Sequence, residues 1–151
     1  MKKILITGIP GTAKTELGNY LHEHYHYEHI DLEKEENIKL LLYKTDSFVE
    51  KLRKKDCDVV ITWGFQPYWH TKFVRLLINE GLKFIWLDGD RTLAYDKFMA
   101  RGTVSEENFF RQMNNITSSK VVELLKPLIV NPFKEDGSFI SIEEIATEII
   151  K

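Results

Sequence analysis

Short apolar runs without in–out alternation recur along this chain, separated by stretches in which apolar residues return every three or four positions. The first pattern is typical of strands buried on both faces, and the second of amphipathic helices. We expect strands at residues 3–7, 29–32, 58–63, 82–88 and 127–131. We expect helices at residues 14–26, 35–55 (with a break near 45–47), 67–80, 90–100, 105–125 and 141–150. This alternation predicts a three-layer α/β fold with a parallel sheet covered on both faces.

Local signals mark the starts of several of these helices. Pro67 suits a first helical turn, and Asp90 can cap the helix that follows it. Ser141 and Glu144 have the spacing of a capping box. Functional residues of such a fold gather where its parallel strands end. In this chain the strand ends fall at residues 7–8, Asp31, residues 63–64, Asp88 and Asn131.

Composition narrows the range of partners. The chain has 151 residues, which suits one domain, and its net charge of -2 gives no reason to expect nucleic acid as the main partner. A single cysteine excludes a disulfide within the chain and fits a reducing compartment, so we expect a cytoplasmic protein. No run approaches the roughly 18 apolar residues of a membrane span, and we expect no membrane partner.

The most specific motif lies between the first strand and the first helix, in the sequence ITGIPGTAKTE of residues 6–16. It nearly matches the phosphate-binding loop G-x-x-x-x-G-K-[S/T], and it stands in the strand–helix context that this loop requires. Backbone N–H groups of such a loop wrap a phosphate, its lysine reaches the β- and γ-phosphates, and its threonine ligates Mg²⁺. The predicted nucleotide contacts are Gly8, Ile9, Pro10, Gly11, Thr12, Ala13, Lys14 and Thr15.

Ala13 stands where the motif has its last glycine. If this position requires a positive φ, a methyl group there costs roughly 1–2 kcal/mol, which weakens the loop without abolishing it. The alternative interpretation is a plain glycine turn between strand and helix, with Lys14 in solvent.

The segment GIPGTAKT resembles the loop of the small P-loop kinases, the group of shikimate, gluconate and adenylate kinases. The resemblance extends over nearly the whole chain, through KFIWLDGDRTLAYDKFMARG, ENFFRQMNNI and LIVNPFKEDGSFISIEEIATEII. It implies a three-layer P-loop kinase fold with a five-stranded parallel sheet in the order 2-3-1-4-5. It also implies ATP and Mg²⁺, and a single domain over residues 1–151 with a short lid near residues 101–105.

Further site residues follow from this resemblance. Relatives carry a D-x-D carboxylate pair after the second strand, and here Asp31 and Glu33 take those places. Asp31 could take a proton from an acceptor hydroxyl or hold a metal-bound water, and the spacing places both carboxylates on one side of an extended segment. A helix cap followed by first-turn acids remains the alternative. Gly64 and Gln66 are expected to contact the acceptor. No acidic residue accompanies Gly64 at its strand end, which shifts the metal role toward Asp31.

The lid and the last loop supply the remaining candidates. Relatives place arginines at the lid to neutralise the transferring phosphate, which favours Arg101 over Arg111. Asn131 and Pro132 follow the last strand, where relatives contact the nucleotide base.

The sequence thus predicts a phosphotransferase that moves the γ-phosphoryl group of ATP to a hydroxyl or phosphate of a small molecule. Lys14, Asp31 and Arg101 are the candidate catalytic residues, and Thr15 and Asp31 the candidate metal ligands. Two alternatives stay open, a non-catalytic nucleotide-binding protein with a degenerate loop and a nucleotide or polynucleotide kinase. The acceptor and the oligomeric state are not specified by the sequence.

Overall fold

The computed structural model describes residues 1–102 and 104–151. Its strands are β1 (Lys3–Gly8), β2 (Glu28–Asp31), β3 (Val59–Thr62), β4 (Lys83–Leu87) and β5 (Leu128–Val130). Its helices are α1 (Lys14–Tyr25), α2 (Glu35–Tyr43), α3 (Thr45–Arg53), α4 (Thr71–Asn79), α5 (Arg91–Met99), α6 (Glu106–Ser119), α7 (Val121–Leu125) and α8 (Ile142–Ile149). The five strands form one parallel sheet in the order β2-β3-β1-β4-β5, which confirms the predicted α/β class and strand order.

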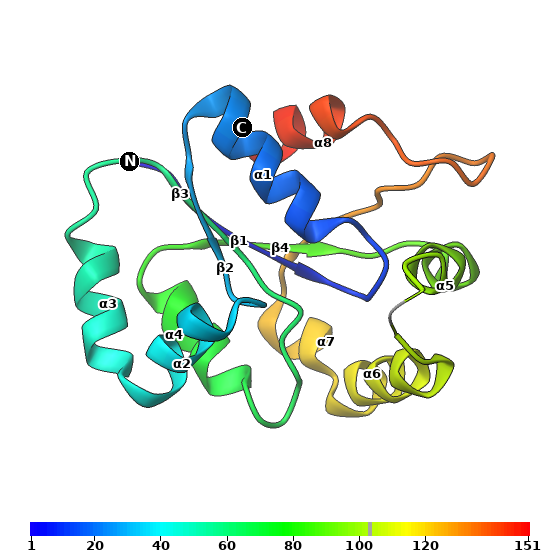
Figure 1. Cartoon of the computed structure of the whole chain (residues 1–151), viewed down its shortest axis with the longest axis horizontal. Coiled ribbons are helices and arrows are strands. Elements are labelled where there is room, and N and C mark those ends of the chain that lie inside the picture. The colour runs from blue at the N-terminus through cyan, green and yellow to red at the C-terminus, as the bar shows by residue number, and fades with distance from the viewer. Residues whose placement is uncertain (103) are drawn as a thin grey trace.

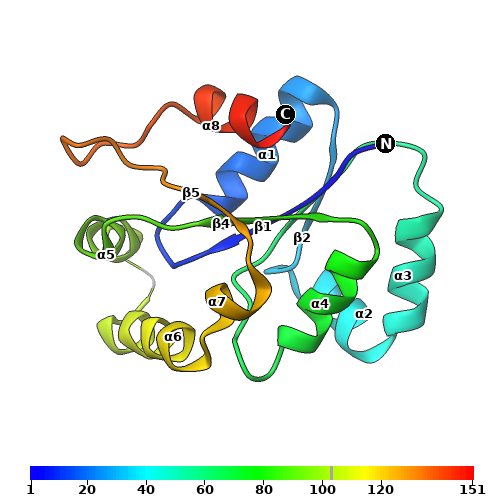
Figure 2. The same cartoon turned by 180° about the vertical axis from the view of Figure 1, so that it is seen from behind.

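Helices cover both faces of this sheet. Helices α1 and α8 lie together on one face, while α2, α3, α4, α6 and α7 lie on the other (Figures 1 and 2). Successive strand residues point to opposite faces, so Ile4 and Ile6 join the core under α1 and α8 while Leu5 joins the larger core. Two-sided burial explains why β1, β3 and β4 read as unbroken apolar runs rather than alternating ones.

Two predicted helices begin or continue differently in the structure. The helix predicted from residue 67 begins only at Thr71, because Tyr68 has a left-handed φ of 75° that a helix does not allow. The helix predicted to reach residue 125 divides at Lys120, whose φ of 54° ends α6 and starts α7. The predicted break near residues 45–47 is confirmed one residue earlier, at Lys44.

The predicted helix caps are confirmed at two positions. The carboxylate of Asp90 accepts hydrogen bonds from the N–H groups of Thr92 and Leu93, and Ser141 accepts one from Glu144. These caps fix where α5 and α8 begin relative to the strands before them. No helix among residues 1–102 and 104–151 combines the length and the apolar character that crossing a membrane requires.

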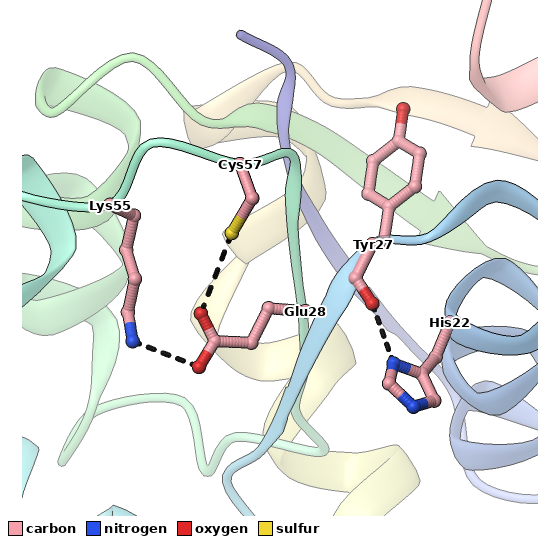
Figure 3. A network of polar contacts seen from close by, with 5 residues as sticks. All are labelled: His22, Tyr27, Glu28, Lys55 and Cys57. Carbon is pink, nitrogen blue, oxygen red and sulfur yellow. Dashed lines mark hydrogen bonds and ion pairs between the residues drawn. The ribbon is translucent and has the colours of Figure 1, made fainter.

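A polar network lies at the amino end of β2, opposite the end where β1 leads into its loop (Figure 3). Glu28 forms an ion pair with Lys55 at 2.8 Å and accepts a weak hydrogen bond from the Cys57 thiol, while the carbonyl of Tyr27 contacts the His22 ring. Partial burial, followed by the charge of Glu28, raises the pKa of Cys57. A thiol held in its protonated form is a poor nucleophile, so Cys57 is not a candidate catalytic residue.

Candidate active site

The predicted phosphate-binding loop joins β1 at the centre of the sheet to α1. Gly8 has a φ of 141°, and a Cβ on it would overlap the backbone of Leu87 in β4. Gly11 has a φ of 81°, and a Cβ there would overlap the carbonyl oxygen of Ala94 in α5. Both glycines are therefore needed where the loop presses against neighbouring backbone.

The first turn of α1 presents its backbone N–H groups to this loop. Within the described ranges, no group accepts a hydrogen bond from the N–H of residues 13–16, whereas the N–H of Leu17 donates to the carbonyl of Ala13 (3.1 Å). Free N–H groups at the positive end of a helix form a binding site for a phosphate. The loop therefore fits the anion that its sequence predicts.

Ala13 adopts the left-handed conformation, with φ of 64° and ψ of 39°. Position 13 therefore does have a positive φ, and an alanine stands where glycine is preferred. The loop nevertheless keeps its turn, and Ala13 serves as the N-cap of α1 without a side-chain hydrogen bond.

We expect the substitution Ala13→Gly to preserve nucleotide affinity or to raise it by up to about tenfold. Removing the methyl group relieves at most ~1–2 kcal/mol of backbone strain. Calorimetric titration with Mg²⁺ and ADP measures the change. A clear loss of affinity would show instead that the alanine is adapted to this loop.

Lys14 lies folded over the loop. Its ammonium group donates to the carbonyl of Ile9 (2.9 Å), the same oxygen that accepts the hydroxyl of Thr12 (2.8 Å). The pKa of Lys14 is lowered to about 8, mainly by burial and in smaller part by the charge of Arg101, against the opposing charges of Glu33 and Glu16. An anion bound beside this lysine would stabilise its charged form.

A cavity of about 500 Å³ opens beside Lys14. It brings together predicted residues from four separate parts of the chain, the loop, the segment after β2, the end of β3 and the end of α5. Its lining includes Pro10, Lys14, Thr15, Glu33, Gly64, Gln66 and Arg101, and it adds Phe98, Val104, Asn108, Arg111 and Gln112. The cavity is thus lined by three cationic side chains, one carboxylate and several amides.

The two predicted carboxylates lie in different environments. Glu33 lines the cavity and accepts a hydrogen bond from the N–H of Gly64 (2.6 Å). Asp31 is buried, does not line the cavity, and accepts from the N–H of Glu33 (3.0 Å). The expectation that both carboxylates share one side of an extended segment was wrong, because the chain turns immediately after Asp31 and the N–H of Lys34 bonds back to its carbonyl (3.2 Å).

Asp31 belongs to a chain of polar contacts behind the cavity. The hydroxyl of Thr62 lies 3.5 Å from its carboxylate and 2.8 Å from Nε2 of His29, whose Nδ1 contacts Asn19 (2.9 Å). A Cβ on Gly18 would overlap the His29 ring, so this helical glycine makes room for the imidazole. Sequence reasoning did not find this arrangement, which joins residues of α1, β2 and β3.

Two arginines line the cavity, one from the segment after α5 and one from α6. Arg101 follows α5, and its guanidinium lies 5.9 Å from the Phe98 ring centroid. Arg111 extends from α6 and donates to the side chain of Asn108 (2.9 Å). The predicted lid at residues 101–105 includes residue 103, which lies outside the described residues, so the lid stays a prediction.

The residues predicted to contact the base do not line the large cavity. Pro132 is buried, and the side chain of Asn131 accepts from the N–H of Phe133 (3.0 Å). A second cavity, of about 290 Å³, does adjoin the loop. It is lined by Thr12, Ala13, Glu16, Leu17, Leu87, Phe139, Ile140, Ile142 and Ile145, and contains neither Asn131 nor Pro132. The roles of these two residues stay predictions.

The fit for Mg²⁺ rests on fewer groups than the fit for phosphate. Thr15 lines the large cavity, where its hydroxyl could join oxygens of a bound nucleotide around the metal, and Glu33 is the nearby carboxylate. No group of three or more His, Cys, Asp or Glu side chains suited to a metal occurs in the described part of the chain. The residues present therefore suit a metal that arrives with the nucleotide, which is how Mg²⁺ commonly binds.

Comparison with known proteins gives matches in structure but not in sequence. No family model and no curated protein matches the sequence. A shikimate kinase from Acinetobacter baumannii, solved with shikimate, is 14% identical with a TM-score of 0.66, over 99% of this chain and 91% of that one. A gluconokinase from Sinorhizobium meliloti 1021 is 14% identical with a TM-score of 0.58, over 99% and 95%. The tunicamycin resistance protein of Deinococcus radiodurans is 14% identical with a TM-score of 0.61, over 99% and 94%.

Likeness at this level of identity concerns the fold. The strand order, the position of the loop after β1 and the nearly complete coverage agree with one another. The chain has the fold of the small P-loop kinases.

Proposed function

We propose that this protein is an ATP-dependent phosphotransferase that moves the γ-phosphoryl group to a hydroxyl or phosphate of a small molecule. One observation carries the proposal. Lys14, Arg101 and Arg111, from three different elements, line one cavity beside the free N–H groups of α1. Catalysis of phosphoryl transfer consists mainly of positioning and of stabilising the charge on the transferring group, for which this set of residues is suited.

The charged residues of the cavity and Thr15 each have a role in this proposal. The N–H groups of residues 13–16 and Lys14 would bind the phosphates, and Thr15 would contact the metal that comes with them. Arg101 and Arg111 would neutralise charge on the lid side. Glu33 would accept the proton of the acceptor hydroxyl, since its carboxylate lines the cavity. Asp31, 9% exposed, would then support the turn that holds Glu33, through its hydrogen bond to the Glu33 N–H.

The cavity also limits the acceptor. Its amide side chains, Gln66, Asn108 and Gln112, can bind hydroxyls as donors or acceptors, and Arg111 can pair with an anionic group. A volume of about 500 Å³ suits a small molecule together with part of the phosphate chain. Solved neighbours of this fold include a gluconokinase and a shikimate kinase, which supports a small hydroxylated acid as acceptor.

The test has two stages. Calorimetry with Mg²⁺ and ADP or ATP first measures nucleotide binding, and a coupled assay for ADP release then screens sugar acids, sugars, nucleosides and nucleoside monophosphates. We expect nucleotide binding at micromolar to millimolar concentration and acceptor-dependent ADP release. Absence of nucleotide binding at millimolar concentration would refute the proposal.

The paired variants Glu33→Gln and Asp31→Asn test which carboxylate acts in transfer. We expect Glu33→Gln to lower turnover by about a hundredfold with little change in ADP affinity, as removal of a general base does. Asp31→Asn should lower it less, because its carboxylate lies behind the cavity. The reverse order of effects would assign the catalytic role to Asp31, as the sequence first suggested.

A second candidate function is nucleotide binding without transfer. It is favoured by the strand end at Thr62, Trp63 and Gly64, where no carboxylate stands, and by the strained Ala13. This candidate predicts tight ATP binding with no ADP release for any acceptor in the screen.

A further inference from the structure

The smaller cavity holds one side chain whose chemistry the proposed function does not use. The cavity begins at Thr12 and Ala13 of the loop and continues between α1, the end of β4 and the chain before and within α8. Most of its lining is apolar, with Leu17, Phe139 and Ile140 among the walls. Such a cavity suits a flat, weakly polar ring attached to a phosphate chain in the loop.

Two polar side chains occur in the described lining of this cavity. The hydroxyl of Thr12 is buried and already donates to the carbonyl of Ile9. The carboxylate of Glu16 is exposed, and within the described ranges it forms no hydrogen bond or ion pair. Glu16 is therefore the side chain that can supply polar recognition here, and a carboxylate can only accept hydrogen bonds.

The position of Glu16 determines which part of a ligand it meets. Its backbone N–H is one of the free groups at the start of α1, while its side chain lines the apolar cavity. A nucleotide with its phosphates at that helix end and its base in the cavity has its ribose between the two. The ribose carries two neighbouring hydroxyls, which are hydrogen-bond donors suited to one carboxylate.

A carboxylate at this position also has a cost. Glu16 lies close enough to Lys14 for its charge to affect the pKa of that lysine. The same charge repels a phosphate held by the loop. Glu16 thus disfavours a bare polyphosphate and favours a ligand whose hydroxyls satisfy the carboxylate.

From these contacts, and on the basis of the proposed nucleotide site, we propose that Glu16 is a specificity residue that binds the 2′- and 3′-hydroxyls of the ribose. The loop then selects ribonucleotides over 2′-deoxynucleotides and over inorganic tripolyphosphate. Glu16 takes no part in the transfer itself.

Calorimetry with ATP, 2′-deoxy-ATP and tripolyphosphate tests this selection in the intact protein and in Glu16→Ala. Glu23→Ala, an exposed acid further along α1, is the matched control. We expect the wild type and the control to bind ATP at least tenfold more tightly than 2′-deoxy-ATP, the size of one hydrogen bond to a charged group. In Glu16→Ala that ratio should fall below about twofold, while tripolyphosphate binds more tightly.

Other results overturn the inference. Equal affinity of the wild type for ATP and 2′-deoxy-ATP, or a ratio unchanged in Glu16→Ala, would show that Glu16 does not contact the ribose. A parallel rise in affinity for both nucleotides in the variant would leave Glu16 only a repelling charge. Failure of the nucleotide site itself is distinct, since then none of the three ligands binds to any of the proteins.

Discussion

Replacing Lys14 by alanine should remove most nucleotide binding. It should also lower phosphoryl transfer by about a thousandfold, which is the upper range for loss of one preorganised hydrogen-bond donor. The ammonium group lies at the junction of the loop and the large cavity, where it can reach a phosphate held by the N–H groups of α1. Calorimetry and the ADP-release assay measure the two effects separately.

Lys39→Ala is the matched control for this substitution. Lys39 is an exposed lysine of α2 whose ion pair with Glu35 lies on the helix surface, so its removal should leave binding and transfer unchanged. If Lys14→Ala bound ADP like the wild type, the loop would be a structural turn and the proposed function would fall. The free energy of unfolding, measured in urea, checks that both variants are folded.

Gly11→Ala should destabilise the protein by about 2–5 kcal/mol, the sum of ~1–2 kcal/mol for a side chain at positive φ and ~1–3 kcal/mol for steric overlap. The overlap is with the carbonyl oxygen of Ala94, which is backbone and cannot rotate away. This loss is a large fraction of the stability of an ordinary domain. Chemical denaturation measures it.

Gly81→Ala separates the two contributions. Gly81 has a φ of 94°, close to the 81° of Gly11, but a Cβ on it would meet no atom within 4 Å. We therefore expect only the backbone cost, ~1–2 kcal/mol. Equal losses at both positions would show that the loop moves away from α5 without penalty.

Much of the site could be predicted because it depends on local sequence. The loop is one continuous segment whose glycines, lysine and threonine have fixed spacing, and its neighbours in the sheet follow from the apolar runs. Gly64 and Arg101 were predicted from the resemblance to the small P-loop kinases, which place a glycine at this strand end and arginines at the lid, and both residues line the large cavity.

What the sequence missed depends on turns and on packing between distant segments. The turn after Asp31 sends Glu33 rather than Asp31 into the cavity, and no alternation pattern reports such a turn. Phe139 lines the smaller cavity because the chain after β5 folds back on itself, pairing Phe133 with Phe139. The place of Arg111 depends on how α6 packs, although its phase on the helix relative to the buried Met113 could have suggested a solvent-facing cation.

The three cationic side chains of the large cavity come from separate segments of the chain. Lys14 comes from the start of α1, Arg101 from the segment after α5 and Arg111 from α6. Like charges gathered in one place push their carriers apart, and Arg101 already makes the charged form of Lys14 less favourable. A bound polyanion would attract all three side chains and so oppose that repulsion. In the proposed complex, the charge of the ligand would therefore hold these segments together as well as occupy the site.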